Sequence, residues 1–235
     1  FTVQQVEVTR LGGRIATYTT NKIREAKHQT SLWVAFEILK KELGRASYRD
    51  ALRERLMSAE MAYVPSVYRS LWSLGLSGIL SLNLDRFAIR AHGELRPGKA
   101  VSEFNGNQAA KFSYLLKGMA PFVVNLHGTV ADESSWVFTK SEIDSLLLDA
   151  GFRSFVASCL TSKTVLFLGM SVDDHSVVEH FETLRSIGVD AGSHYWLTDR
   201  RDKKTDALAE CAGIRLIRYE NRDGSHSEIE EVFKD

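Results

Sequence analysis

The hydrophobic positions divide the chain into a helical part and a part in which strands and helices alternate. Between residues 21 and 75, apolar side chains recur three and four positions apart, which predicts a mainly helical segment. From residue 76 to residue 235, short apolar runs alternate with amphipathic stretches. That alternation is typical of a mainly parallel, doubly wound sheet. We therefore predict a Rossmann-like α/β fold that forms a single domain over residues 1–235.

Several apolar runs are too short for helices and are predicted to be buried strands. They cover residues 78–82, 122–126, 164–168, 194–197 and 214–219, with a further short strand expected at 135–139. Helices are predicted at residues 21–43, 47–61, 65–74, 83–92, 152–160, 173–187, 203–212 and 227–233, and one more begins at residue 141. Residues 93–120 contain several Pro, Gly and Asn residues and are predicted to form a long loop.

Polar residues follow three of the predicted strands at the point where each strand ends. Asn83 and Asp85 follow the first strand, His127 ends the second, and Ser171 and Asp173 follow the third. In a parallel sheet all these strand ends lie at one edge, where open α/β sheets bind ligands. The edge would combine a titratable base, an amide, a carboxylate and a hydroxyl beside helix amino termini. We therefore predict a site for a phosphate-bearing ligand.

Each of these residues also has a purely structural interpretation. Asn83, Asp85 and Asp173 can cap the helices that follow the strands. Ser171 follows Gly169 and can be a turn residue. His127 can be a buried histidine whose nitrogen atoms are satisfied by the fold. The pattern along the chain leaves both interpretations of every residue open.

The composition excludes several other classes of function. The 30 basic residues balance the 30 acidic ones, and no basic stripe with interleaved aromatic residues is visible, so nucleic-acid or membrane-surface binding is not favoured. The apolar runs are too short to span a bilayer. The two cysteines, Cys159 and Cys211, lie far apart, which indicates a reducing, cytoplasmic environment. The histidine spacings do not suggest a metal site.

Three short motifs occur in the order found in one protein family. Residues 81–85 read Ser-Leu-Asn-Leu-Asp, residues 125–128 read Asn-Leu-His-Gly, and residues 167–171 read Phe-Leu-Gly-Met-Ser. In this order and spacing they resemble the T-x-N-x-D, His-Gly and G-x-S elements of the sirtuin-like fold, in particular of the branch found in bacterial anti-phage defence proteins. The resemblance covers roughly residues 45–235. Position 81 is serine where the family commonly has threonine, and position 84 is leucine where tyrosine or isoleucine is frequent.

The resemblance implies that the chain binds NAD+ as its substrate and cleaves the bond between nicotinamide and ribose. Asn83 would orient water or substrate at the nicotinamide ribose, Asp85 would contact the nicotinamide side, and His127 would be the general base. An imidazole with an ordinary pKa near 6.5 can accept a ribose proton at neutral pH. The implied products are nicotinamide and ADP-ribose. The residues implied in binding the cofactor are Gly128, Gly169, Ser171, Asp173 and Asp199.

Two departures from the family pattern shape the expected activity. The usual G-A-G-x-S phosphate loop is not found, and residues 11–14, Leu-Gly-Gly-Arg, are a poor substitute, so the loop either preceded Phe1 in a longer protein or has degenerated. Protein-deacylating sirtuins carry a four-cysteine zinc ribbon, which two cysteines cannot build. NAD+ hydrolysis is therefore favoured over deacylation, and no metal is expected.

The resemblance also implies a biological role and partners. Proteins of this branch are effectors of bacterial immunity that deplete NAD+, and they are controlled by self-assembly or by a sensor protein. A homo-oligomer or a regulatory protein partner is therefore expected, with Trp33, Trp72 and residues 93–120 as candidates for the regulatory surface. The alternatives are a non-catalytic module that binds NAD+, ADP-ribose or a partner protein, and a hydrolase that acts on nucleosides or phosphoribosyl compounds.

Overall fold

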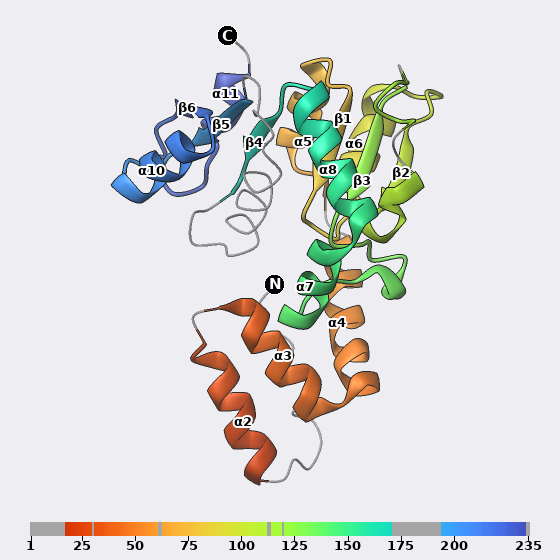
Figure 1. Ribbon diagram of the computed structural model, residues 1–235, viewed down its shortest axis with the longest axis vertical. Helices are drawn as coiled ribbons and strands as arrows, with labels where there is room; N and C mark the ends of the chain where they lie inside the picture. Colours follow the sequence, from red (N-terminus) through yellow and green to blue (C-terminus); the bar gives the residue numbers. More distant parts are fainter. Residues whose placement is uncertain are drawn as a thin grey trace. The chain divides into compact units, whose positions relative to one another are not determined.

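A computed structural model describes residues 17–29, 31–60, 63–111, 114–118, 120–170 and 194–233 (Figure 1). The chain divides into two compact units. The first unit comprises Phe1–Val64, Gly78–Asn107 and Phe122–Leu146, and the second comprises Pro65–Ser77, Gln108–Pro121 and Leu147–Asp235. The prediction of a single domain over the whole chain stays a prediction. None of the described helices is both long enough and apolar enough to cross a membrane.

The first unit begins with three helices, α2 (Thr17–Lys27), α3 (Leu32–Leu43) and α4 (Arg45–Glu60). The helix predicted at residues 21–43 is therefore two helices. The backbone N–H groups of His28 and Gln29 donate to carbonyls only three residues back, which tightens and ends α2. A new helix then starts after Ser31, whose extended backbone occupies the N-cap position. Neighbouring helices α2 and α3 contact each other along their length (Figure 1).

The helices of the first unit share one hydrophobic core with two loops of its sheet. The buried helical positions recur at the three- and four-residue spacing that the sequence predicts. The core consists of Ile23, Ala26, Ala35, Phe36, Leu39, Tyr48, Ala51, Leu52, Leu56, Leu84, Val130 and Trp136. Leu84 lies between Asn83 and Asp85 in the sequence, and Val130 lies two positions after Gly128. The loops that carry those residues are thus anchored in the helical core.

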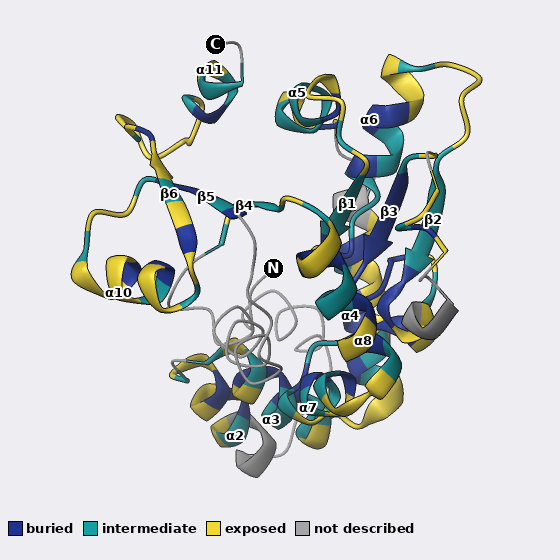
Figure 2. Cartoon of the chain, turned by 45° about the horizontal axis from the view of Figure 1, so that its top comes forward, coloured by how far each residue is buried: buried dark blue, intermediate teal, exposed yellow. Residues whose placement is uncertain are grey.

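The sheet of the first unit has three parallel strands, β1 (Gly78–Ser81), β2 (Ser102–Asn105) and β3 (Phe122–Asn125), in the order β1-β3-β2. Every residue of the central strand β3 is buried (Figure 2). Ser81 and Asn105 both pair with Asn125, so the three strands end level with one another. The 3-10 helix η1 (Gly106–Lys111) follows β2, and α6 (Phe87–Leu95) connects β1 with β2.

Strand β2 corrects the prediction that residues 93–120 form a loop. Its sequence, Ser-Glu-Phe-Asn, contains one apolar residue and shows no alternation that would indicate a strand. It is a strand because its backbone groups pair with those of the buried strand β3. The prediction of a strand at residues 135–139 is also wrong. A 3-10 turn, η2 (Glu133–Ser135), precedes α7 (Lys140–Leu148) there, and an Asp132 oxygen accepts from the Ser134 N–H at 3.0 Å.

The second unit contains a second three-stranded parallel sheet, with the order β4-β5-β6. Its strands are β4 (Leu166–Leu168), β5 (His194–Thr198) and β6 (Ile214–Arg218), and its helices are α5 (Ser66–Ser73), α8 (Ala150–Ser162), α10 (Lys203–Cys211) and α11 (Ile229–Val232). Leu197, Tyr219 and Ile229 form one buried hydrophobic cluster of this unit together with partly buried neighbours. Trp72 is 0% exposed, so its predicted place on a regulatory surface is wrong.

The α/β class with parallel strands is confirmed, and the chain has a Rossmann-like fold. Strands and helices alternate after residue 78, as the hydrophobic pattern predicts. The helix predicted at residues 173–187 and the first sixteen residues lie outside the described part of the chain.

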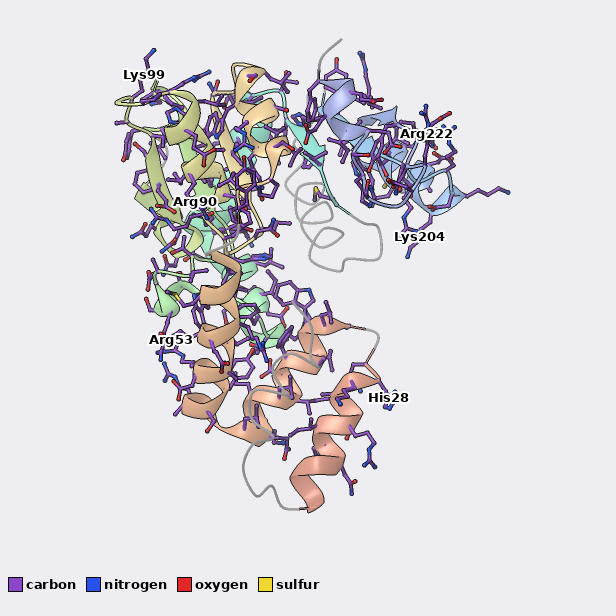
Figure 3. All side chains as sticks on the ribbon, turned by 180° about the vertical axis from the view of Figure 1, so that it is seen from behind. His28, Arg53, Arg90, Lys99, Lys204 and Arg222 are labelled. Atoms are coloured by element: carbon purple, nitrogen blue, oxygen red, sulfur yellow. The ribbon has the colours of Figure 1, made fainter. Side chains whose placement is uncertain are left out.

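Side-chain contacts tie the helices of the first unit to the segment that follows β3. Arg53 of α4, labelled in Figure 3, forms an ion pair with Glu133 of η2. Glu142 of α7 accepts hydrogen bonds from the Thr139 N–H at 3.0 Å and from Lys40 Nζ of α3 at 2.7 Å. Burial alone would raise the pKa of Glu142, but these donors and the Phe138 N–H outweigh it and hold the pKa below its ordinary value.

Replacing Glu142 with glutamine is expected to lower the free energy of unfolding at pH 7 by about 1–3 kcal/mol. Because the pKa of Glu142 is depressed in the folded chain, its stabilisation is complete above about pH 4.5 and is lost as the pH falls through the folded pKa. Urea unfolding of wild type and Glu142→Gln at pH 7 and at pH 3 measures how much unfolding free energy the variant loses. This loss should be smaller at pH 3. Asp144→Asn on the same helix is the control, since Asp144 pairs with Lys140 at the surface. An equal loss at both pH values would contradict the prediction.

Candidate active site at the carboxyl ends of β1 and β3

The loops that follow β1 and β3 lie side by side. The Leu126 N–H donates to the Ser81 carbonyl at 2.7 Å, and the Val130 N–H donates to the Leu84 carbonyl at 3.0 Å. Because Ser81 and Asn125 are paired, Asn83 and His127 each lie two residues beyond level strand ends. The structure thus brings together the two predicted motifs of the first unit at one edge of the sheet.

The loop after β1 is organised by short polar side chains. Ser81 Oγ accepts from the Asn83 N–H at 3.1 Å, and an Asp85 carboxylate oxygen accepts from the Phe87 N–H at 3.1 Å. Helix α6 therefore begins at Phe87 rather than at residue 83, because Asp85 terminates the turn that precedes it. Asn83 is exposed, whereas Asp85 is half-buried with its carboxylate oriented by the backbone. Asp85 thus has the structural role that the sequence left open.

His127 is 5% exposed and lies against an aromatic side chain of the helical segment. The ring centroids of His127 and Trp33 are 5.3 Å apart, and the ring planes are nearly perpendicular at 89°. Trp33 is the second residue of α3 and is itself half-buried. The sequence singled out Trp33 only as a candidate for a regulatory surface. No pattern along the chain placed it beside His127, which is 94 positions further on (127 − 33 = 94).

Gly128 allows the chain to fold back after His127. It has a φ of 95°, and a Cβ atom placed there would overlap the carbonyl of Ser135. The returning segment is held by hydrogen bonds from the Val137 N–H to the His127 carbonyl at 3.0 Å and from the Thr129 N–H to Ser135 Oγ at 3.1 Å. The backbone at His127 and Thr129 is therefore held in place by hydrogen bonds to the returning segment. A contact between Gly128 and the cofactor stays a prediction.

A polar network beneath the strand ends links the two loops through β2. Glu103 of β2 accepts from Arg86 Nε at 3.0 Å and from Arg86 Nη2 at 2.5 Å, and it accepts from Asn125 Nδ2 at 3.3 Å. Arg86 directly follows Asp85 in the sequence, and Asn125 lies two residues before His127 and is 1% exposed. Sequence reasoning missed Glu103 because its role depends on the pairing of β2 with β3.

Replacing Glu103 with alanine is expected to lower the free energy of unfolding by about 1–3 kcal/mol, because the buried Asn125 amide loses its acceptor. Urea unfolding followed by circular dichroism measures the loss. Glu220→Ala is the matched control, since Glu220 pairs with Arg222 at an exposed position, where such pairs contribute at most about 1 kcal/mol. Equal losses in the two variants would show that the network does not stabilise the fold.

The remaining predicted residues belong to the second unit or lie outside the described part of the chain. Gly169 follows β4 with a φ of 69°, and Asp199 follows the adjacent parallel strand β5. An oxygen of Asp199 accepts from Asn221 Nδ2 at 2.7 Å and lies 3.9 Å from His226 Nδ1. Ser171 and Asp173 are outside the described residues. The cofactor-binding roles of these four residues stay predictions.

Within the described ranges, His, Cys, Asp and Glu side chains do not gather into a group of three that could hold a metal ion. Cys159 is buried in α8, and Cys211 is exposed in α10. Burial raises the pKa of the Cys159 thiol to about 12, so this thiol is protonated at neutral pH.

The fold and the strand-end residues define a Rossmann-like α/β protein with a candidate site beyond its parallel strands. A family model described as the SIR2-like domain matches residues 77–217, which is more than half of the chain. The chain therefore belongs to the SIR2-like family. This membership connects it with NAD-related activity in general. A comparison with curated proteins gives no significant match.

Proposed function

We propose that the chain hydrolyses NAD+ at the bond between nicotinamide and ribose and releases nicotinamide and ADP-ribose. The observation that carries the proposal is the pair of backbone hydrogen bonds, Leu126 to Ser81 and Val130 to Leu84, that holds the two loops together. Through these bonds, Asn83, Asp85 and His127 belong to one edge of the sheet. They supply an amide, a carboxylate and an imidazole, which are the groups that the proposed mechanism uses.

The proposed reaction assigns one role to each of these side chains. The C1′–N1 bond breaks with its electron pair going to the nicotinamide nitrogen, which neutralises the pyridinium and leaves an oxocarbenium-like ribose. The Asp85 carboxylate stabilises that positive charge, and its bond to the Phe87 N–H fixes its direction. Asn83 orients the water that attacks C1′. The proton released by the water passes to His127 by way of the ribose hydroxyl groups.

Hydrolysis of NAD+ is favoured over NAD-dependent deacylation of proteins by the cysteine content. The family's deacylases carry a four-cysteine zinc ribbon, whereas this chain has two cysteines on separate helices. The substrate test incubates the purified chain with NAD+ and quantifies nicotinamide and ADP-ribose by chromatography. Parallel incubations contain a nucleoside or NAD+ with an acetylated peptide. We expect products only from NAD+ and at equal rates with and without the peptide, whereas release of a free base from the nucleoside would favour the rival hydrolase.

A second candidate function is a non-catalytic module that binds NAD+ or ADP-ribose. It is favoured by the engagement of the Asp85 carboxylate in the turn before α6, where it accepts from the Phe87 N–H. Titration calorimetry with NAD+ and ADP-ribose separates the two functions. Binding without the appearance of nicotinamide, also in the presence of cell extract, would support the module and overturn the hydrolase.

The biological role that we propose is depletion of NAD+ as an effector of bacterial anti-phage defence, under the control of self-assembly or of a regulatory protein. It is supported by the resemblance of the three motifs to that branch of the family. The test measures cellular NAD+ after phage infection of bacteria that express the protein or its His127→Gln variant. A fall in NAD+ that occurs equally with both would contradict the role.

A further inference from the structure

We propose that Trp33 is a positioning residue for His127, so that the helical segment before the SIR2-like domain completes the site. This inference rests on the proposed function for its effect on catalysis, but the contact itself does not. Trp33 packs with its ring perpendicular to the imidazole at a centroid distance of 5.3 Å. The match to the SIR2-like family begins at residue 77, so Trp33 lies outside the domain that the family shares.

The contact of Trp33 with His127 is one of four that line up along α3. Trp33 contacts His127, and one helical turn later the Phe36 ring lies 5.5 Å from the Phe138 ring. These positions lie on one face of the helix, because residues three or four apart in an α-helix are neighbours. The aromatic half of this face therefore covers His127 and the segment that returns after it.

The polar half of the same face continues the contact with the segment after β3. The carboxylate of Glu37 accepts from the Ser141 N–H at 3.1 Å, and Lys40 Nζ donates to Glu142 at 2.7 Å. Residues 33, 36, 37 and 40 of α3 thus meet residues 127, 138, 141 and 142 in the same order. The position of Trp33 is set by a whole helix face, not by one isolated contact.

The physical consequence for His127 is a restricted and partly dehydrated imidazole. The ring of a histidine rotates about its last side-chain bond between broad orientations, and a perpendicular aromatic neighbour favours one of them. A large indole beside the ring also displaces water from it. A base that already points in one direction loses less entropy when the substrate binds. Truncation of Trp33 should therefore slow the chemical step more than it weakens binding.

The kinetic test compares wild type, Trp33→Phe and Trp33→Ala in the full chain. We expect Trp33→Ala to lower kcat on the order of tenfold with little change in KM, whereas Trp33→Phe keeps an aromatic ring and most of the activity. Leu32→Ala is the matched control, because Leu32 is the preceding residue of the same helix and is largely exposed. Equal kcat values for Trp33→Ala and Leu32→Ala would overturn the effect on catalysis.

A spectroscopic test examines the contact without relying on enzyme activity. A protonated imidazole quenches the fluorescence of an adjacent indole, so emission at low pH should contain a component that titrates with His127. That component should disappear in Trp33→Phe and in His127→Gln. The other tryptophans, Trp72, Trp136 and Trp196, are buried and present in every variant, so their emission cancels in the differences.

The two tests separate failure of this inference from failure of the proposed function. If the wild type turns over no NAD+ but the titrating emission is present and is lost in both variants, the hydrolase is wrong and the contact stands. Nuclear magnetic resonance of the His127 ring should then still show an altered titration in Trp33→Ala. If the emission does not titrate and Trp33→Ala leaves the His127 titration unchanged, Trp33 does not position the imidazole and the inference fails.

Discussion

Replacement of His127 with glutamine is expected to lower kcat for NAD+ hydrolysis by about 10²–10⁴, the range that a positioned general base typically contributes. Glutamine is chosen because His127 is almost fully buried, and a smaller residue would leave a cavity beside Trp33. Glutamine approximates the volume of the imidazole but cannot take up a proton at neutral pH. The measurement is the initial rate of nicotinamide release at saturating NAD+.

Two further variants control for folding and for the choice of histidine. His28→Ala changes an exposed histidine at the end of α2, labelled in Figure 3, and should leave the rate unchanged. Asn83→Ala should lower the rate together with His127→Gln but should not lower the free energy of unfolding, because Asn83 is exposed. Equal turnover by wild type, His127→Gln and Asn83→Ala would remove His127 and Asn83 from the mechanism.

Replacement of Gly128 with alanine is expected to lower the free energy of unfolding on the order of 3 kcal/mol or more. Two costs combine at this position, since a residue with a Cβ atom is strained at a φ of 95° and the Cβ would overlap the backbone carbonyl of Ser135. The Ser135 carbonyl cannot move away freely, because Ser135 Oγ is hydrogen-bonded to the Thr129 N–H within the same loop. Urea unfolding measures the loss, and the variant should also lose activity.

Two other glycines of the first unit separate these costs. Gly44 has a φ of 72° with open space around its Cα, so Gly44→Ala should cost only about 1 kcal/mol. Gly106 does not have a left-handed φ, but a Cβ atom there would overlap the Leu126 carbonyl. Gly106→Ala therefore reports the overlap alone, and we expect about 1–3 kcal/mol. If Gly128→Ala lowers the free energy of unfolding no more than Gly44→Ala does, the loop after His127 accommodates the added methyl group. Gly128 is then not required for the shape of the loop.

The strongest predictions from the sequence concern buried strands. Residues 122–125 form a strand that is buried throughout, and the apolar run at 122–126 predicts it because a chain segment with apolar residues on both faces is excluded from water. The predicted strands at 78–82 and 214–219 are likewise confirmed within one residue. The break between α2 and α3 and the late start of α6 were missed, because hydrogen bonds within single turns decide where helices begin and end.

Some residues of the candidate site could be predicted from the sequence, and others could be found only in the structure. Asn83, Asp85 and His127 follow their strands in the sequence, so their place at one sheet edge depends on local patterns that a single chain displays. Glu103 and Trp33 do not follow from such patterns. Glu103 reaches Asn125 because β2 pairs with β3, and Trp33 reaches His127 because α3 packs its face against the segment after β3.

By itself, the sequence determined the α/β class, the buried strands and the polar residues at their carboxyl ends, because burial and strand length are properties of consecutive residues. Only the tertiary structure decided that the two loops are bonded side by side, that β2 is a strand, and that an indole from the helical segment lies against His127. These features join residues that are tens of positions apart. Their free energy comes from packing and hydrogen bonds between segments, which the order of residues along the chain does not display.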